Sequence, residues 1–309
     1  IPALGWIDDL ITVFESGYKT ARINAFINAQ IASKKLRLGA KKCFMMHVGN
    51  KHEDYNNNQF YVDGWDVKTV ESYTAGEKDW IDTPVESMKE ISHVNSERYL
   101  GQIISSDSKN TANITKLRNK GIGLKNKVIE MLNTMPGGIY HFEISVIFRN
   151  AYIISSMLSN SEVWYGITKA EIRLLEQVDE QFTRELFECS SHVATELLYL
   201  DLGLTPISFI IKSRKLMFLH HILHQDSESL LYRFFSAQLS NPTKGDWVSE
   251  ILEVMEEMEL DMELEDIGHI SKRIFKSIVK GKMKDKAFQY LMCVFIPSPV
   301  REGSTLFGD

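Results

Sequence analysis

The chain opens with two short apolar stretches, residues 4–7 and 10–14, on either side of two adjacent acidic residues, Asp8 and Asp9. Short apolar runs bounded by turn residues are typical of β-strands, so we predict two buried strands joined by an acidic turn. An Asp-Asp turn on a surface explains the pair without further chemistry, because Asp is common in turns. If the carboxylates are buried, a bound cation is their natural partner, and Mg2+ or Mn2+ suits oxygen ligands of this kind.

Residues 18–38 have the period of a helix with a stripe of small and apolar side chains: Tyr18, Ala21, Ala25, Ala29, Ala32 and Leu36. Such a stripe can lie close against a sheet. Gly39 is predicted to cap the end of this helix, and residues 41–48 are predicted to form a strand. No acidic residue occurs between Glu15 and Glu53, so helix and strand present a basic surface. That surface is either a solvated face or a phosphate-binding face beside the aspartates.

Residues 50–94 are polar and are predicted to be an insertion with one hairpin, in which residues 60–62 pair with residues 65–67 across Asp63-Gly64. The side chains of residues 98–105 alternate as they do along a single β-strand. Gly101 lies within that run, where another backbone or a ligand can approach closely.

Beyond Asp107 the pattern becomes helical. An apolar seam runs through Ile114, Leu117, Gly121, Leu124, Val128 and Met131. Basic residues accompany the seam: Lys109, Lys116, Arg118, Lys120, Lys125 and Lys127. They form either a solvated helix face or a surface for nucleic-acid phosphates. Further helices are predicted at about residues 141–160, 168–188, 206–225 and 230–239, with apolar stripes that form a core.

Charge is distributed in blocks toward the end of the chain. Residues 246–266 contain ten acidic and no basic residues, and residues 272–286 form a basic helix. We expect the two segments to pair with one another or to stay solvated, although the acidic one could mimic nucleic acid or bind a basic partner. His220 and His224 share a helix face as paired zinc ligands do, but their apolar surroundings favour a structural role. Residues 296–309 are predicted to be a disordered tail.

Composition sets outer limits on the fold. A chain of 309 residues with 44% hydrophobic residues can bury one large core or two smaller ones, and a net charge of -6 argues against a uniformly basic protein. Cys43, Cys189 and Cys293 lie far apart without a CxxC pair, which favours a reducing intracellular setting, nuclear or cytoplasmic. No apolar run has transmembrane length, so no membrane partner is expected.

The order of these features resembles the palm of reverse transcriptases, most closely those of non-LTR retrotransposons. Trp6-Ile7-Asp8-Asp9 resembles the family's aromatic-x-Asp-Asp hairpin, whose aspartates hold the catalytic metal. Lys42, after the helix, resembles the lysine that reaches the incoming triphosphate, and Tyr99-Leu100-Gly101 resembles the hairpin that grips the primer. The similarity continues through residues 137–140 and 164–166 to about residue 290.

The resemblance implies an α+β N-terminal part followed by an all-α part. Residues 1–105 would be a partial palm of antiparallel strands with one helix, residues 106–160 a thumb, and residues 161–295 a helical extension. The implied function is RNA-directed DNA polymerase, a nucleotidyltransferase that uses Mg2+ or Mn2+ held by Asp8 and Asp9. Trp6 and Ile7 would line the nucleotide pocket. The RNA template and DNA primer would be held through their phosphates by Lys116, Arg118, Lys120, Lys125 and Lys127.

Two departures from the family pattern affect this interpretation. Trp6 replaces the more common Phe or Tyr, and Ile7 is bulky for a position next to the primer end. The resemblance implies that the chain is the back part of a larger protein, in which the fingers and the earlier palm motif with a third metal-binding Asp would lie upstream of Ile1. The chain alone is therefore expected to be inactive. The alternative is a non-catalytic relic that acts as a helical module for nucleic-acid or protein interaction. It would tolerate change at Asp8 and Asp9 but not on the basic helix.

Overall fold

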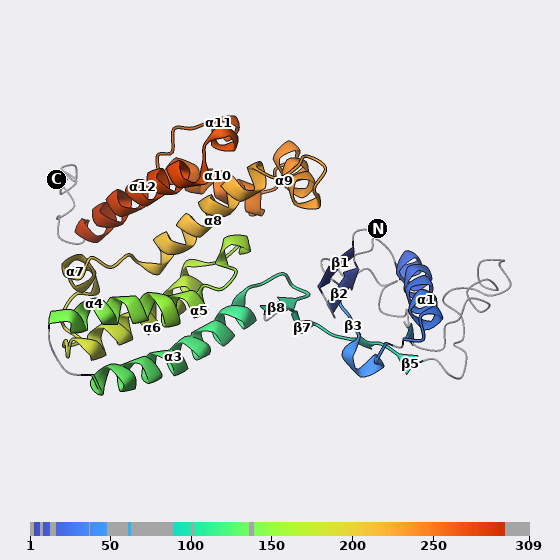
Figure 1. Cartoon of the computed structure of the whole chain (residues 1–309), viewed down its shortest axis with the longest axis horizontal. Coiled ribbons are helices and arrows are strands. Elements are labelled where there is room, and N and C mark those ends of the chain that lie inside the picture. The colour runs from blue at the N-terminus through green and yellow to red at the C-terminus, as the bar shows by residue number, and fades with distance from the viewer. Residues whose placement is uncertain are drawn as a thin grey trace, which may run out of the picture. The chain divides into compact units, whose positions relative to one another are not determined.

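The computed structural model describes residues 3–6, 9–12, 17–36, 38–47, 61–62, 89–99, 102–135 and 139–293, and for part of the first unit and at residues 139–140 it gives the backbone alone. The chain divides into two compact units, Ile1–Asn113 and Ile114–Asp309. Figure 1 shows the elements of both, and each unit is considered by itself.

Short strands and one long helix make up the described part of the first unit. They are β1 (Ala3–Trp6), β2 (Asp9–Thr12), α1 (Gly17–Ser33), the 3-10 turn η1 (Ala40–Lys42), β3 (Phe44–Met45), β4 (Tyr61–Val62), β5 (Lys89–Glu90), β6 (Ser92–His93), β7 (Ser96–Tyr99) and β8 (Gln102–Ser105). The strands form four separate pairs, and β1–β2, β4–β5 and β7–β8 are antiparallel. The β3–β6 pair is parallel, which corrects the prediction of antiparallel strands only.

Helix α1 ends at Ser33, earlier than predicted, and its cap is not Gly39. The amide of Leu36 donates to the carbonyl of Ile31 at 3.1 Å, and the amide of Lys35 donates to Ala32 at 2.8 Å. Lys35 has a φ of 59°. These two bonds and the left-handed residue form a Schellman motif, which satisfies the last carbonyls of the helix before the chain reaches Gly39.

The small-residue stripe of α1 is confirmed over its middle turns. Ala25 and Ala29 are buried, whereas Ala32 and Leu36 are exposed because they lie at and beyond the end of the helix. The helix lies against β4. Small side chains therefore allow the close approach to a strand that the sequence predicted.

Two strand predictions in this unit are wrong. Lys42 lies in η1, where its amide donates to the carbonyl of Gly39 at 2.8 Å, so of the described residues 41–47 only Phe44–Met45 form a strand. Residues 98–105 are not one strand but parts of two, with Tyr99 opposite Gln102. A glycine inside an alternating run marks a reversal as readily as a close approach.

The polar segment 50–94 contributes strands to the first unit. Tyr61–Val62 pairs with Lys89–Glu90, and Ser92–His93 pairs with β3. The strand predicted at residues 65–67 lies outside the described residues, as does the predicted tail at residues 296–309. The C-terminal end of this segment is therefore paired with a strand outside the segment, β3.

The second unit is helical throughout its described part, which confirms the predicted all-α region. Its elements are α3 (Thr111–Asn133), which begins in the first unit, α4 (Ile139–Phe148), the π-helix η3 (Arg149–Ile154), α5 (Ser155–Met157), the 3-10 turn η4 (Ser161–Val163), α6 (Lys169–Leu186), α7 (Thr195–Asp201), α8 (Ile207–Leu223), α9 (Leu230–Ser240), α10 (Trp247–Glu257), α11 (Leu264–His269) and α12 (Lys272–Met292). The helix predicted at residues 141–160 is thus interrupted by a π-helix and ends sooner.

Helix α8 contributes residues to two hydrophobic cores of this unit. Ile207 and Ile211 belong to the first core, with residues of α3, η3, α5 and α6. Leu216, Leu219 and Ile222 belong to the second, with residues of α9, α10, α11 and α12. The apolar residues of α8 therefore pack into two different cores, although the helix also carries Lys212, Arg214 and Lys215.

Two glycines of α3 provide a matched test of this packing. A Cβ at Gly121 would lie 2.4 Å from Sδ of the buried Met157, whereas a Cβ at Gly123 would meet nothing within 4 Å. We expect Gly123→Ala to stabilise the chain by about 0.5–1 kcal/mol through the backbone entropy of glycine in a helix. Gly121→Ala should instead destabilise it by about 1–3 kcal/mol through overpacking. Urea unfolding followed by circular dichroism measures both, and an equal stabilisation by the two variants would contradict the contact with Met157.

Candidate functional site

The candidate metal site lies on the β1–β2 hairpin. The register places Trp6 opposite Asp9 and Leu4 opposite Ile11, which confirms the two predicted strands. Asp9 is therefore the first residue of β2, at the end where the two strands join. Ile7 and Asp8 lie outside the described residues, as do the side chains of Trp6 and Asp9. The position of the carboxylates relative to Lys42 remains a prediction.

Lys42 and its neighbour Lys41 lie on the surface of η1, with both side chains exposed. Cys43 follows them and is half-buried, and burial raises the pKa of its thiol. An exposed lysine on a turn rather than on a strand is free to change rotamer, so Lys42 can reach toward an anion without disturbing a sheet.

The β7–β8 hairpin is fastened to the first turn of α3 by one buried side chain. Oδ1 of Asn113 accepts the Ile103 amide at 3.2 Å, and its Nδ2 donates to Oε1 of Gln102 at 2.6 Å. Asn113 is buried. Tyr99, half-buried, pairs with Gln102 across the hairpin, whereas Leu100 and Gly101 lie outside the described residues. Asn113 therefore fixes the β7–β8 hairpin to the first three residues of α3, Thr111–Asn113, which belong to the same unit.

The predicted phosphate contacts on α3 do not share one environment. Lys120 and Lys127 are exposed, and Lys116 and Arg118 are half-buried. Lys125 is buried and forms an ion pair with Glu185 of α6. Its inclusion among the phosphate contacts is therefore a mistake, because its charge is already matched by a carboxylate of the neighbouring helix.

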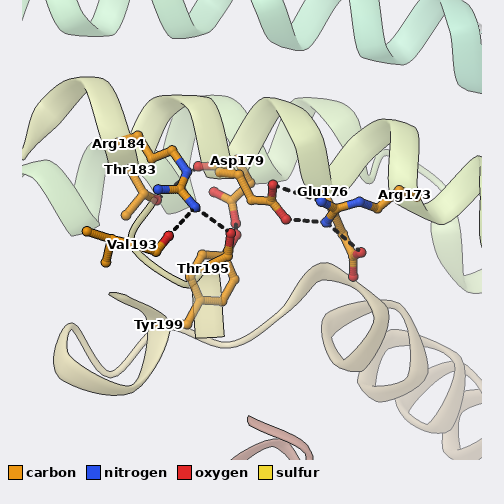
Figure 2. A network of polar contacts seen from close by, with 9 residues as sticks. Arg173, Glu176, Asp179, Thr183, Arg184, Val193, Thr195 and Tyr199 are labelled. Carbon is orange, nitrogen blue, oxygen red and sulfur yellow. Dashed lines mark hydrogen bonds and ion pairs between the residues drawn. The ribbon is translucent and has the colours of Figure 1, made fainter. Parts of the chain in front are cut away.

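A buried ion pair that the sequence did not predict lies in the second unit. Arg149, the first residue of the π-helix, and Asp179 of α6 are both buried, and Nε of Arg149 donates to Oδ1 of Asp179 at 2.6 Å. The hydroxyl of Tyr199 donates to Oδ2 of Asp179 at 2.6 Å. Figure 2 shows the Asp179 carboxylate and the Tyr199 ring pointing toward one another.

Burial raises the pKa of Tyr199 well above its usual range, and the Asp179 carboxylate raises it further. Burial by itself would lower the pKa of Arg149, but the charge and hydrogen bonds of Asp179 outweigh it and raise that pKa. Arg149 stays charged and Tyr199 stays neutral over the whole working range of pH. Arg149 is thus a permanent cation, and Tyr199 is a permanent donor to the same carboxylate.

The partners of this network account for its role. Nη1 of Arg149 donates to Asn150 at 3.0 Å, and Nη2 donates to the carbonyl of Thr205 at 3.3 Å. Oγ1 of Thr183 donates to the backbone carbonyl of Asp179 at 2.9 Å. The network ties the π-helix, α6, α7 and the start of α8 together. Its polar groups are engaged with one another, so it positions helices and does not offer a reactive group.

A second arginine fastens the loop between α6 and α7 (Figure 2). Nη2 of Arg184 donates to the carbonyl of Val193 at 2.7 Å and to Oγ1 of Thr195 at 2.9 Å, and Nη1 donates to the carbonyl of Ser190 at 2.8 Å. The carbonyl of Ser190 also accepts the Val193 amide at 3.2 Å, so Arg184 adds side-chain bonds to the backbone bond of the loop. Arg184 therefore fixes where α7 begins and, with it, where Tyr199 is presented to Asp179.

The paired histidines on α8 have structural partners. Nε2 of His220 donates to the carbonyl of Ile270 at 2.8 Å, and the ring stacks on Phe275 with centroids 5.1 Å apart. Nδ1 of His224 donates to the carbonyl of His220 at 2.9 Å. In the part of the chain that the structure describes, no group of three or more His, Cys, Asp or Glu is arranged to hold a metal ion.

The pKa of His220 is lowered mainly by burial, and nearby His224 and Lys272 lower it further. The ordinary pKa of a histidine side chain is 6.5. Below pH 6.5 residue 220 is therefore protonated in the unfolded chain more readily than in the native protein. The stability from this neutral histidine is therefore complete above pH 6.5 and is lost as the pH falls below it.

We expect the thermal midpoint of the wild-type protein to drop between pH 7.5 and 5.5. The drop should be smaller in His220→Gln, whereas the exposed control His192→Gln should keep the wild-type drop. An unchanged drop in His220→Gln would contradict this assignment.

The acidic segment at 246–266 pairs mainly with α8. Glu250 binds the buried Lys215 at 2.6 Å, and Glu257 pairs with Lys212. Glu259 pairs with Lys286 of α12. The expected pairing with the basic helix at 272–286 is thus confirmed at one position only, and most of the cations of α12 are left for other contacts.

No protein-family model, characterised protein or solved structure matches the chain. No helix among the described residues is long and apolar enough to cross a bilayer.

Proposed function

We propose that the chain is the rear palm, thumb and helical extension of an RNA-directed DNA polymerase of the non-LTR retrotransposon type. The observation that carries the proposal is the β7–β8 hairpin joined through Asn113 to the first turn of the basic helix α3. A polymerase needs the primer end and the duplex behind it held in one register, and a hairpin bonded to the residues from which a basic helix continues suits that need. The order of the β1–β2 hairpin, Lys42 and the β7–β8 hairpin supports the same proposal.

The donor set at the hairpin fits a divalent cation. Carboxylate oxygens are the ligands that Mg2+ and Mn2+ prefer, so Asp8 and Asp9 would hold such ions. When bound, two such ions stabilise the attacking and leaving oxygens of phosphoryl transfer. Lys42 would neutralise charge on the incoming triphosphate, and Trp6 and Ile7 would bound the nucleotide. Tyr99 and its neighbours Leu100 and Gly101 would hold the primer end. The reaction then depends on positioning and charge neutralisation.

A second candidate, from a different class, is a non-catalytic helical module for nucleic-acid or protein interaction. It is supported by the two cores of the second unit, which draw on residues from Ile114 onward. A unit with its own cores can fold and bind without the palm. The two candidates differ at Asp8 and Asp9, which only the polymerase requires.

Binding of template-primer duplex is expected to depend on salt through the exposed lysines of α3. Lys120→Glu with Lys127→Glu should flatten the slope of log affinity against log salt by about 2, since each lost phosphate contact removes about 0.9. Fluorescence anisotropy with a labelled RNA–DNA duplex at several KCl concentrations measures the slope.

The matched control for that experiment carries the same charge change at exposed positions outside α3. Lys169→Glu with Lys244→Glu should leave the slope close to the wild-type value, because these residues lie on α6 and in the loop before α10. Equal slopes for all three proteins would place the duplex elsewhere and would count against the thumb assignment.

A further inference from the structure

Helix α12 exposes a row of four cations with no acidic residue among them. The row is made of Arg273, Lys276, Lys280 and Lys284. At 3.6 residues per turn these positions fall within an arc of about 80°, so they lie on one face. All four are exposed, and none takes part in the ion pairs that the structure shows among residues 102–135 and 139–293.

The second core fixes the direction in which this row points. Phe275, Val279 and Met283 of the same helix are buried in that core. Lys286, on a different face, pairs with Glu259. The acidic residue of α12, Asp285, is turned about 100° from Lys284. If α12 rotated so that the row faced away from solvent, these core residues would become exposed. The packing of the core therefore holds the four cations outward.

The row is positive in a chain whose net charge is -6. The three residues of the acidic segment 246–266 that form ion pairs have other partners, because Glu250 and Glu257 pair with α8 and Glu259 pairs with Lys286. A solvated helix face normally mixes charges of both signs. A face of one sign carried by a negative protein instead fits a polyanion.

The dimensions fit a nucleic-acid strand. Arg273 and Lys284 are about 16 Å apart along the helix axis at 1.5 Å per residue, which is the length of about five nucleotides in a strand that keeps the stacked rise of about 3.4 Å. Phe288 follows Lys284 by one turn, and its side chain is 56% exposed. An exposed aromatic ring at the end of a cationic row is the arrangement on which unpaired bases stack.

We propose that α12 is a binding surface for single-stranded nucleic acid, with phosphates on the row of cations and a base stacked on Phe288. This surface is separate from α3 and does not depend on the polymerase assignment. An anionic bilayer fits it less well, because a membrane-surface helix must release its apolar face, and here Phe275, Val279 and Met283 keep that face in the core.

The test is the binding of a labelled 20-nucleotide oligouridine to the 309-residue chain, measured by fluorescence anisotropy at several KCl concentrations. Lys276→Gln, Lys280→Gln and Lys284→Gln together should flatten the salt slope by about 2, since each phosphate contact to a single strand contributes about 0.7. Phe288→Leu should keep the slope but weaken binding by at least about fivefold, because stacking is not an ionic interaction. Circular dichroism melting confirms that each variant is folded.

The control is a triple variant with the same charge change at exposed positions on other elements: Lys169→Gln, Arg233→Gln and Lys244→Gln. It should keep the wild-type slope. Equal flattening by both triple variants would overturn the proposal, because net charge would then explain the binding. Absence of oligouridine binding, or preference for a duplex together with normal binding by Phe288→Leu, would also overturn it. The variants of Lys120 and Lys127 leave α12 intact, so failure of the thumb assignment is distinguishable from failure here.

Discussion

Asp179→Asn is expected to lower the free energy of unfolding by about 3–5 kcal/mol, because it leaves the buried guanidinium of Arg149 without its counter-charge. Asp179 has 0% exposure, and its two carboxylate oxygens accept bonds from Arg149 and Tyr199. The amide group of Asn retains one acceptor and replaces the other with a donor that faces a cation. Urea unfolding followed by far-UV circular dichroism measures the loss in the helical unit.

The partly exposed pair of Arg173 and Glu180 on the same helix is the control. The side chain of Arg173 is 52% exposed and that of Glu180 is 14% exposed, so Glu180→Gln leaves a solvated guanidinium and should cost no more than about 1 kcal/mol. Replacing both buried partners, as Arg149→Met with Asp179→Leu, should recover much of the loss, since no unpaired charge then remains. A cost for Asp179→Asn as small as that of Glu180→Gln would mean that the network does not hold these helices together.

The helices of the second unit were predictable because their apolar positions repeat with the period of a helix. Leu175, Val178 and Phe182 of α6 recur at this period and are buried. Asp179 falls within this stripe, and that was the available signal for a buried charge. Its partners, Arg149 and Tyr199, are 30 and 20 residues away in the sequence. Hydrophobic periodicity says nothing about which distant residue a buried charge meets.

Predictions failed where a local hydrogen-bond pattern outweighed residue preference. Lys35 follows the end of α1 in a left-handed conformation, although glycine, as at position 39, is the residue that favours this conformation. The carbonyls of Ile31 and Ala32 already accept the amides that close the helix, so the helix ends before Gly39 is reached. Lysine is usually a surface residue. Lys125 is nevertheless buried, because its alkyl chain is apolar and its charge is paired with Glu185. Of the candidate site, the first hairpin was predicted from the apolar runs on either side of Asp8 and Asp9, whereas the second was implied by the resemblance at residues 99–101 and not by the pattern of residues 98–105.

Primer extension is expected to be absent from the 309-residue chain alone with Mg2+ and triphosphates. Two metal ions need more negative charge than Asp8 and Asp9 supply, and the nucleotide needs a second wall to be held in line. The loss of positioning can reach about 7–11 kcal/mol of barrier lowering. A longer protein that adds reverse-transcriptase fingers and the earlier palm motif with its third Asp should extend the primer, as a gel-based extension assay with an RNA template would measure.

In that longer protein, Asp8→Asn or Asp9→Asn should abolish extension and leave duplex binding unchanged, because the carboxylates hold metal while the basic helix α3 holds phosphates. Asp261→Asn, in the exposed loop after α10, removes the same charge away from the hairpin and should retain full activity. Extension that survives both hairpin variants would contradict the metal site and favour the non-catalytic module. Template-dependent extension by the 309-residue chain that disappears in Asp8→Asn would instead show that its own residues hold enough metal and position the nucleotide without added fingers.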